Sequence, residues 1–431
     1  MIRIIYLFLF LIFLTGCSFN KNSKFWTSSK EIKIEKNFKE ILKKNENINE
    51  ELNPNFRIKL DKLSSFSYSN KQLNNEGRFN FDGNLKKISR YSFKKIKNFY
   101  EYEPQVSFNK NDLIFFDNKG SILKFNDNSK LIWKKNYYSK SEKKQNPILQ
   151  FENNKENLIV ADNVAKYYLL DLKSGNLVWS KNNLAPFNSQ IKIHNDKFFI
   201  IDFSNTLRCY SIKNGDEIWN VSTQNSLIRS KKKLSMIIHK DKIYFNNSLG
   251  DITAVDIEKG QILWQLPTQS SLVYESSFSL ETSDIIADDE TIYFSNNNNQ
   301  FFSIDIKTGS FKWKNKLNSS LRPIMIGNLL FTITLEGYLA VIEKKSGNII
   351  RVSDVFKNIK LKKRKKIRPT GFIAGLNNIY LSTSNGRLLI INIETGKTIS
   401  TLKIDNDKIS TPFVKNNNLF VIKDNAIIKL N

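Results

Sequence analysis

Two cysteines and two histidines are the side chains of this 431-residue sequence whose types are most often used for metal binding or covalent chemistry. His194 and His239 stand at the same place in two neighbouring repeats, just before an apolar run, where other repeats carry Ala287 or Gly327. A position that accepts such replacements is typical of a turn. The sequence has no haem-attachment motif, no zinc-ligand spacing and no vicinal cysteines. We therefore expect no catalytic residue, no metal and no cofactor.

Cys17 ends an N-terminal segment with the pattern of a secretion signal. Arg3 supplies the positive charge, and residues 4–13 form an apolar run that is too short for a membrane span. The ending Leu14-Thr15-Gly16-Cys17 resembles the bacterial lipobox, in which the cysteine is diacylated. We expect a signal peptide over residues 1–16, lipidation of Cys17, and an anchor at the periplasmic face of the outer membrane. The alternative is an ordinary cleaved signal with an incidental cysteine.

Cys209 is the second cysteine and lies in the strand-like run Leu207–Tyr210. With Cys17 lipidated it has no disulfide partner, although exported proteins can form disulfides. We therefore expect Cys209 to be a buried, unreactive thiol.

The net charge of +26 would suit acidic lipid headgroups or an acidic partner. The lysines are scattered, however, so a lysine-rich composition explains most of this charge. The exception is Lys360–Arg368 (KLKKRKKIR), which is either a solvated loop or a surface that faces acidic groups of a membrane or partner. Export argues against nucleic acid as a partner.

A short phrase recurs seven times, at intervals of about 40–50 residues, which is the signature of a repeat architecture. It consists of a turn, often with glycine, followed by an apolar strand that closes four residues later. The glycines are Gly175, Gly215, Gly260 and Gly309, and the closing tryptophans are Trp133, Trp179, Trp219, Trp264 and Trp313. We expect structural roles for both: glycine permits a positive φ in the turn, and tryptophan packs between adjacent repeats.

Each repeat also contains a hairpin and a third strand before the tryptophan strand, which predicts four antiparallel strands per repeat. Eight sets of the first three strands are present, but only seven fourth strands. An N-terminal strand over residues 86–93 could supply the missing one and avoid an open edge. We therefore predict an all-β fold: an eight-bladed β-propeller over residues 81–431, closed by that strand and preceded by a lipidated polar tether over residues 17–80. A seven-bladed ring is the structural alternative.

The pattern Asp-x-x-[Thr/Ser]-Gly-x-x-x-Trp, found at Asp171–Trp179 and Asp305–Trp313, resembles the docking repeat of the PQQ-like propellers. Together with the lipobox and a single ring, the chain resembles the BamB-type outer-membrane protein assembly lipoproteins of that superfamily. Departures include Ser129 in place of glycine, and Arg351 and Ser400 in place of tryptophan.

The resemblance implies a non-enzymatic scaffold of the β-barrel assembly (BAM) complex, which binds the BamA-type subunit and other BAM components and assists outer-membrane protein clients. It places the partner-binding loop after the third blade, here Asn225–Arg229 with Leu227, Ile228 and Arg229. Two apolar residues beside an arginine suit an interface. A second, weaker candidate is the loop Leu272–Glu281, with Glu281.

Two other functions remain open at this stage. PQQ-dependent dehydrogenases share the propeller, and they resemble one another in a calcium site, a catalytic aspartate and often a vicinal cysteine pair. This sequence shows no such constellation, which disfavours the enzyme. A propeller that binds a periplasmic polymer, such as peptidoglycan, is the other alternative.

Overall fold

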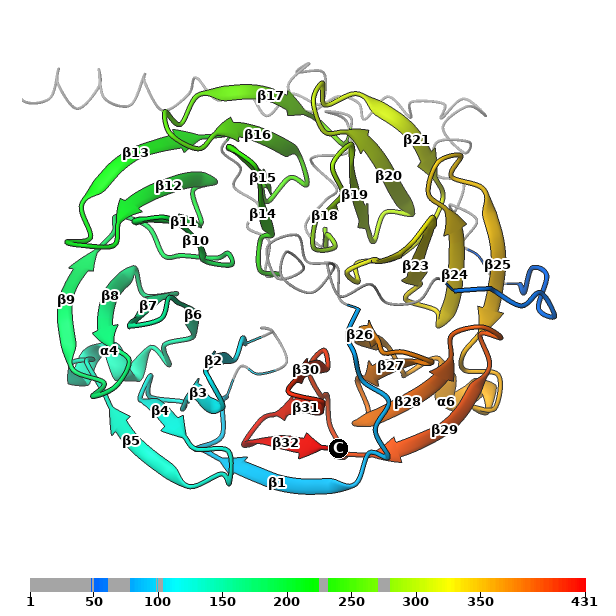
Figure 1. The fold of residues 1–431 in the computed structure, drawn as a ribbon, viewed down its shortest axis with the longest axis horizontal. Coiled ribbons are helices and arrows are strands. Elements are labelled where there is room, and N and C mark those ends of the chain that lie inside the picture. Colours follow the sequence, from blue (N-terminus) through cyan, green and yellow to red (C-terminus); the bar gives the residue numbers. More distant parts are fainter. Residues whose placement is uncertain are drawn as a thin grey trace, which may run out of the picture. The chain divides into compact units, whose positions relative to one another are not determined.

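Eight four-stranded antiparallel sheets are arranged radially in a ring, as seen in Figure 1. This computed structural model describes residues 48, 50–60, 78–97, 99, 104–224, 232–269 and 280–431. These residues belong to one compact unit, Asn47–Asn431. The predicted eight-bladed all-β propeller is confirmed, and the seven-bladed alternative is wrong. Cys17, the signal peptide and most of the expected tether lie outside the described residues.

The first four blades follow the chain, each running from the ring axis outward. Blade 1 contains β2 (Ser107–Asn109), β3 (Asp112–Phe116), β4 (Ile122–Phe125) and β5 (Leu131–Lys135). Blade 2 contains β6 (Leu149–Asn153), β7 (Asn157–Asp162), β8 (Lys166–Asp171) and β9 (Leu177–Asn182). Blade 3 contains β10 (Lys192–His194), β11 (Lys197–Ile201), β12 (Thr206–Ser211) and β13 (Glu217–Ser222). Blade 4 contains β14 (Met236–His239), β15 (Lys242–Asn246), β16 (Ile252–Asp256) and β17 (Ile262–Leu266).

Blades 5 to 7 repeat this order, and blade 8 differs. Blade 5 contains β18 (Ile286–Ala287), β19 (Thr291–Asn296), β20 (Gln300–Asp305) and β21 (Phe311–Asn315). Blade 6 contains β22 (Ile324–Ile326), β23 (Leu329–Ile333), β24 (Tyr338–Glu343) and β25 (Ile349–Asp354). Blade 7 contains β26 (Pro369–Ala374), β27 (Asn378–Thr383), β28 (Arg387–Asn392) and β29 (Thr398–Lys403). Blade 8 contains β30 (Phe413–Lys415), β31 (Asn418–Lys423), β32 (Ala426–Leu430) and, outermost, β1 (Lys87–Ser92).

The pairing of β1 with β32 brings a strand from the N-terminal part of the described chain into the same blade as the last three strands. The strands are antiparallel, and Tyr91 lies opposite Ile427. Tyr91 is almost fully buried and packs against Phe125 of blade 1 and Phe420 of blade 8. The outer strand of blade 8 therefore also contributes to the core between blades 8 and 1.

Burial explains why the middle strands are continuous apolar runs while the outer strands alternate. Ile292 and Phe294 of β19, like Phe198 and Ile200 of β11, are completely buried because both faces of the middle strands meet neighbouring blades. The outer strand β9 instead alternates between exposed and half-buried residues. Most of the hydrophobic core therefore lies between blades.

Each tryptophan docks on the glycine turn of the next blade rather than on the glycine of its own repeat. Trp179 lies against Gly215 and Trp264 against Gly309, so that an added Cβ would come within 2.7 and 2.6 Å of the respective indole ring. The same contact joins Trp133 to Gly175, Trp219 to Gly260 and Trp313 to Gly347. These glycines have φ values near +70°, such as 71° at Gly215, so they are required for backbone conformation and for space.

Arg351 takes the place of the tryptophan between blades 6 and 7. The indole Nε1 of Trp179 donates to the carbonyl of Ile212, three residues before Gly215. Arg351 Nη2 donates, over 3.1 Å, to the carbonyl of Ile393, three residues before Gly396. The arginine therefore makes the hydrogen bond that Trp179, Trp264 and Trp313 make in their blades.

Residues 51–58, which we call the N-terminal strap, lie along the outer edge of blade 6. Leu52 and Val352 exchange two backbone hydrogen bonds, of 3.1 and 2.9 Å. Ile58 donates to the carbonyl of Glu394 in blade 7, and the Phe56 carbonyl accepts from Arg351. Part of the segment expected to be a tether thus pairs with the outer edge of blade 6 through an isolated β-bridge and also contacts blade 7.

Strand direction alternates within each blade, which determines the face of the ring at which each connection lies. Turns that join the first strand to the second, or the third to the fourth, share one face, which we call the turn face. Turns between the second and third strands lie on the opposite face, together with the connections between blades. We call this the connection face. The short helices α4 (Lys140–Lys144) and α6 (Leu361–Arg364) both belong to connections between blades.

Candidate functional site

The candidate site is the part of the connection face between blades 3 and 5. The predicted partner-binding residues Leu227, Ile228 and Arg229 belong to the connection between β13 and β14, and they lie outside the described residues. Glu281 belongs to the connection between β17 and β18, and it is described and exposed. Both connections begin and end on the same face in consecutive blades.

The first stem of the blade 3–4 connection is fixed by a buried asparagine. Asn205 lies in the turn between β12 and its preceding strand and has a positive φ of 58°. Its side-chain Nδ2 donates to the carbonyl of Gln224 over 3.1 Å and to Ser248 Oγ over 2.8 Å. The Asn205 carbonyl accepts from both the backbone N–H and the hydroxyl of Thr223. Asparagine suits this position because it tolerates a positive φ and its amide both donates and accepts.

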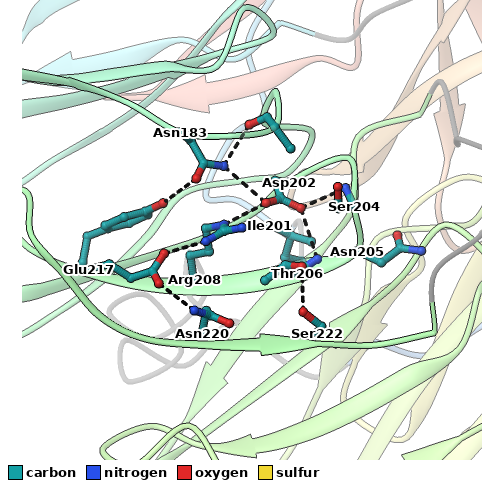
Figure 2. A network of polar contacts seen from close by, with 12 residues as sticks. Asn183, Ile201, Asp202, Ser204, Asn205, Thr206, Arg208, Glu217, Asn220 and Ser222 are labelled. Carbon is teal, nitrogen blue, oxygen red and sulfur yellow. Dashed lines mark hydrogen bonds and ion pairs between the residues drawn. The ribbon is translucent and has the colours of Figure 1, made fainter.

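Asp202, at the start of the same turn, organises the polar network drawn in Figure 2. Its buried carboxylate accepts backbone N–H groups of Ser204 and Thr206 over 2.8 and 3.2 Å, which closes the turn. The second oxygen accepts from Arg208 Nε over 2.7 Å. Arg208 continues to Glu217 on the outer strand, over 2.6 Å. Burial opposes the charge on Arg208, but the hydrogen bonds that it donates to Asp202 and Glu217 prevail and raise its pKa.

The second stem of this connection is held by blade 3. Leu234 donates to the carbonyl of Asn188 over 2.8 Å, and Gln190 donates back to the carbonyl of Leu234. Asn188 Nδ2 also donates to the Lys232 carbonyl over 3.3 Å. Residues 225–231 therefore connect two anchored points, Gln224 and Lys232.

Ser320, in the blade 5–6 connection, joins this stem to Glu281. The Lys232 ammonium group donates to the carbonyl of Ser320. Ser320 Oγ donates to Glu281 Oε2 over 3.2 Å. The backbone of Glu281 is itself fixed, because its N–H donates to Asn297 Oδ1 over 2.9 Å. The structure thus brings Glu281 close to Lys232, which lies three residues after the predicted binding segment.

Opposite charges lie near the ring axis on the innermost strands of blades 2 and 3. Burial lowers the pKa of Lys192 to about 8, against the opposing effect of Glu152 and Asp284. Burial also raises the pKa of Glu152, which Lys192 opposes. Each group favours the charged form of the other. We therefore interpret Lys192 and Glu152 as neutralising each other's charge near the ring axis.

The remaining reactive side chains include Cys209 on β12 and His239 on β14. Cys209 is completely buried, and burial raises the pKa of its thiol to about 12. His239 lies 3.3 Å from Asp289, and burial lowers the pKa of its imidazole. Within the described ranges, no group of three or more His, Cys, Asp or Glu side chains could hold a metal ion.

Sequence reasoning missed Asp202, Asn205, Lys232 and Ser320, which anchor the site. It also missed the docking role of Arg351, which lies between blades 6 and 7. An Asp or Asn recurs at the corresponding turn of blades 1 to 5, as Asp117, Asp162, Asp202, Asn247 and Asn296. This recurrence in the sequence could have identified the turn that Asp202 closes. The contact between Lys232 and Ser320 joins residues 88 positions apart, so no local sequence pattern could predict it.

A closed ring of eight blades whose tryptophans dock on glycine turns defines the class of PQQ-like β-propellers. The family described as outer membrane protein assembly factor BamB matches residues 118–353, more than half of the 431 residues. The chain belongs to this family. In the described residues, no helix is long and apolar enough to cross a membrane.

Solved structures with the same fold include proteins of different functions. BamB from Moraxella catarrhalis is 16% identical with a TM-score of 0.65, and the match covers 80% of this chain and 99% of that chain. The designed protein Ika8 is 12% identical with a TM-score of 0.60, covering 82% and 99%. Quinohemoprotein alcohol dehydrogenase from Comamonas testosteroni is 11% identical with a TM-score of 0.61, covering 82% and 78%. At these identities the likeness concerns the fold alone. None of the curated proteins matches the sequence.

Proposed function

We propose that the chain is a non-enzymatic scaffold lipoprotein of outer-membrane β-barrel assembly. In this role, acylated Cys17 anchors it at the periplasmic face of the outer membrane, and the ring binds the BamA-type subunit and assists the folding and insertion of outer-membrane proteins. The observation that carries the proposal is the family match over residues 118–353.

The binding surface we propose is centred on Leu227, Ile228 and Arg229, with Glu281 beside it. Support comes from the two stems, because a segment between fixed anchors loses less conformational freedom on binding. Apolar residues next to an arginine are typical of the few residues that dominate an interface. The exposed carboxylate of Glu281 adds a negative charge close to Lys232, so the surface offers both signs of charge to a partner.

Isolation of the protein from washed membranes tests this role. We expect a BamA-type subunit among the proteins that co-purify with it, and its absence from stringently washed complexes would contradict the proposal. Arg229→Glu should weaken the association without changing the unfolding temperature. Lys213→Glu is the matched control, because Lys213 is exposed on the turn face. If both variants lose the subunit to the same extent, the segment that contains Arg229 is not specifically part of the interface.

Membrane attachment is tested separately. The variant Cys17→Ser should be released from membranes by washing with high salt, whereas the wild type should remain until detergent is added. Retention of Cys17→Ser through that wash would contradict the lipid anchor.

The enzymatic alternative has its own assay. Purified protein mixed with PQQ and calcium should not reduce an artificial dye in the presence of alcohols or sugars. Turnover in that assay would overturn the scaffold role.

A further inference from the structure

The basic run Lys360–Arg368 is the largest concentration of charge that the proposed function does not use. It forms the connection between β25 and β26 and contains helix α6. All five lysines of the run and Arg368 are exposed, and Leu361 is 75% exposed among them. The run therefore presents six cations and one apolar side chain to the connection face.

The backbone of the run is fixed by the two residues that turn inward. Arg364 Nη1 donates to Asp354 over 2.6 Å. Its guanidinium lies 5.0 Å from the centre of the Tyr338 ring and 5.9 Å from that of Phe356, which adds cation–π attraction. Ile367 is buried at the other end. The exposed cations are thus carried by an ordered element.

Carboxylates neutralise many lysines elsewhere but not those of the run. Lys197 pairs with Glu258, and Lys344 pairs with Asp288 over 2.8 Å. Lys357, just before the run, pairs with Glu51 of the strap over 2.8 Å. Among the described residues, none of the five lysines of the run has a carboxylate within ion-pair distance, and Asp354 pairs with Arg364. The positive charge of the run is therefore available to a ligand.

From this arrangement we infer that the basic run is a docking site for the headgroups of anionic phospholipids. Lysine carries a compact charge without the planar fork by which arginine recognises a single carboxylate, and five of the six exposed cations are lysines. Such a cluster suits a diffuse anionic surface, which attracts each nearby lysine. Leu361 can enter the boundary between headgroups and acyl chains while the lysines remain at the phosphates.

This inference goes beyond the proposed assembly role. The run lies between blades 6 and 7, whereas the proposed partner surface lies between blades 3 and 5, as Figure 1 makes clear from the positions of α6 and β13 to β18. One face of the ring would then contact lipid on one side and a protein on another. The inference does not require the acyl chains, because the test below uses a chain without them.

The test is flotation of the full chain carrying Cys17→Ser with phosphatidylcholine vesicles, with or without phosphatidylglycerol. We expect binding to the vesicles that contain phosphatidylglycerol, and loss of this binding as salt is added. Combining Lys360→Gln, Lys362→Gln, Lys363→Gln and Lys366→Gln should weaken it by at least about tenfold. The matched control changes Lys173, Lys213, Lys307 and Lys345 to glutamine, all exposed on the turn face, and should bind as before.

Thermal melting of both four-site variants checks that the ring remains folded. Absence of binding to the anionic vesicles, or equal binding by both variants, would overturn the inference. Unchanged vesicle binding with loss of a co-purifying acidic protein would also overturn it, in favour of a protein partner. None of these outcomes depends on Arg229, so failure here leaves the assembly role to its own test.

Discussion

At the scale of single residues, Arg351 has an unusual environment for a charged side chain. It is completely buried, and every hydrogen bond recorded for its guanidinium among the described residues goes to a backbone carbonyl. Burial without a carboxylate lowers its pKa to about 10. The side chain is still charged at neutral pH, so its carbonyl partners must compensate for the loss of water.

Replacing Arg351 with alanine should lower the free energy of unfolding by about 3 kcal/mol or more, because it leaves a cavity and several unpaired carbonyls. Arg351→Trp should cost less, since an indole N–H can donate to Ile393 as Trp179 donates to Ile212. Urea denaturation would measure both changes, with Lys345→Ala as an exposed control. Equal stability of wild type and Arg351→Ala would contradict the docking role.

Asp162 provides a test by pH. Burial raises its pKa from 3.8 to about 6, although the hydroxyl of Tyr138 and two backbone N–H groups donate to it. Because the folded pKa lies above the unfolded one, this group stabilises the fold fully below the unfolded pKa, and that contribution is lost as pH rises through about 6.

We therefore expect the wild type to gain stability relative to Asp162→Asn as pH falls from about 7 to about 4, by up to about 3 kcal/mol. Asparagine keeps an acceptor for the backbone N–H groups but does not titrate. Chemical denaturation at several pH values would measure the difference. Parallel pH dependence of the two proteins would exclude Asp162 as the source.

Residue types in the docking motif could be recognised from the sequence because glycine, turn and tryptophan lie close together in each repeat. The same reasoning treated Arg351 as a lost tryptophan. Its true role depends on Phe56, 295 residues away in the chain, and on the geometry of blade 7. No local pattern carries that information.

At the scale of elements, neighbouring blades repeatedly make the same contact, in which the tryptophan of one blade packs on the glycine turn of the next. Gly309 combines a φ of 73° with an indole that leaves no room for a Cβ. Gly327 also has a positive φ, of 57°, but its turn joins β22 to β23 and does not dock a tryptophan. Comparing substitutions at these two glycines therefore distinguishes the cost of backbone strain from the cost of disturbing the tryptophan contact.

Gly309→Ala should lower the unfolding free energy by more than about 2 kcal/mol, because the cost of backbone strain at residue 309 adds to the cost of displacing Trp264. Gly327→Ala should cost about 1 kcal/mol, from strain alone. Tryptophan fluorescence during unfolding would report both values. If the two substitutions cost the same, close docking does not contribute to stability.

The strap is an element that sequence reasoning did not predict. Its residues are polar and do not repeat, so they were assigned to a tether. Only the folded ring reveals that Leu52 meets the open edge of β25 and that Glu51 caps its end by accepting the N–H of Asp354. The predicted binding segment remains a prediction, since its residues lie outside the described ranges.

At the scale of the whole molecule, β1 is the strand that completes blade 8. The count of strands in the sequence indicated this strand, because three strands in the last repeat left one place open. Tyr91 on β1 is 1% exposed and contacts Phe125 of blade 1 as well as Phe420 of its own blade, whereas Ile88 on the same strand is 49% exposed. These two residues allow a controlled test.

Tyr91→Ala should lower the unfolding free energy by about 3–5 kcal/mol, as expected for removal of a buried aromatic side chain. Ile88→Ala should change it by less than about 1 kcal/mol. Thermal or urea unfolding of the two variants measures the contrast. A small effect of Tyr91→Ala would mean that the last blade holds together without its outer strand.

The pairing of β1 with β32 in blade 8 has a consequence for biosynthesis. Arg90 of β1 contacts Asn425, 335 residues later, so β1 cannot pair until β32 has been synthesised. A nascent chain interrupted anywhere before β32 would display unsatisfied backbone edges. Proteases and chaperones could thus distinguish unfinished molecules from finished ones by geometry alone.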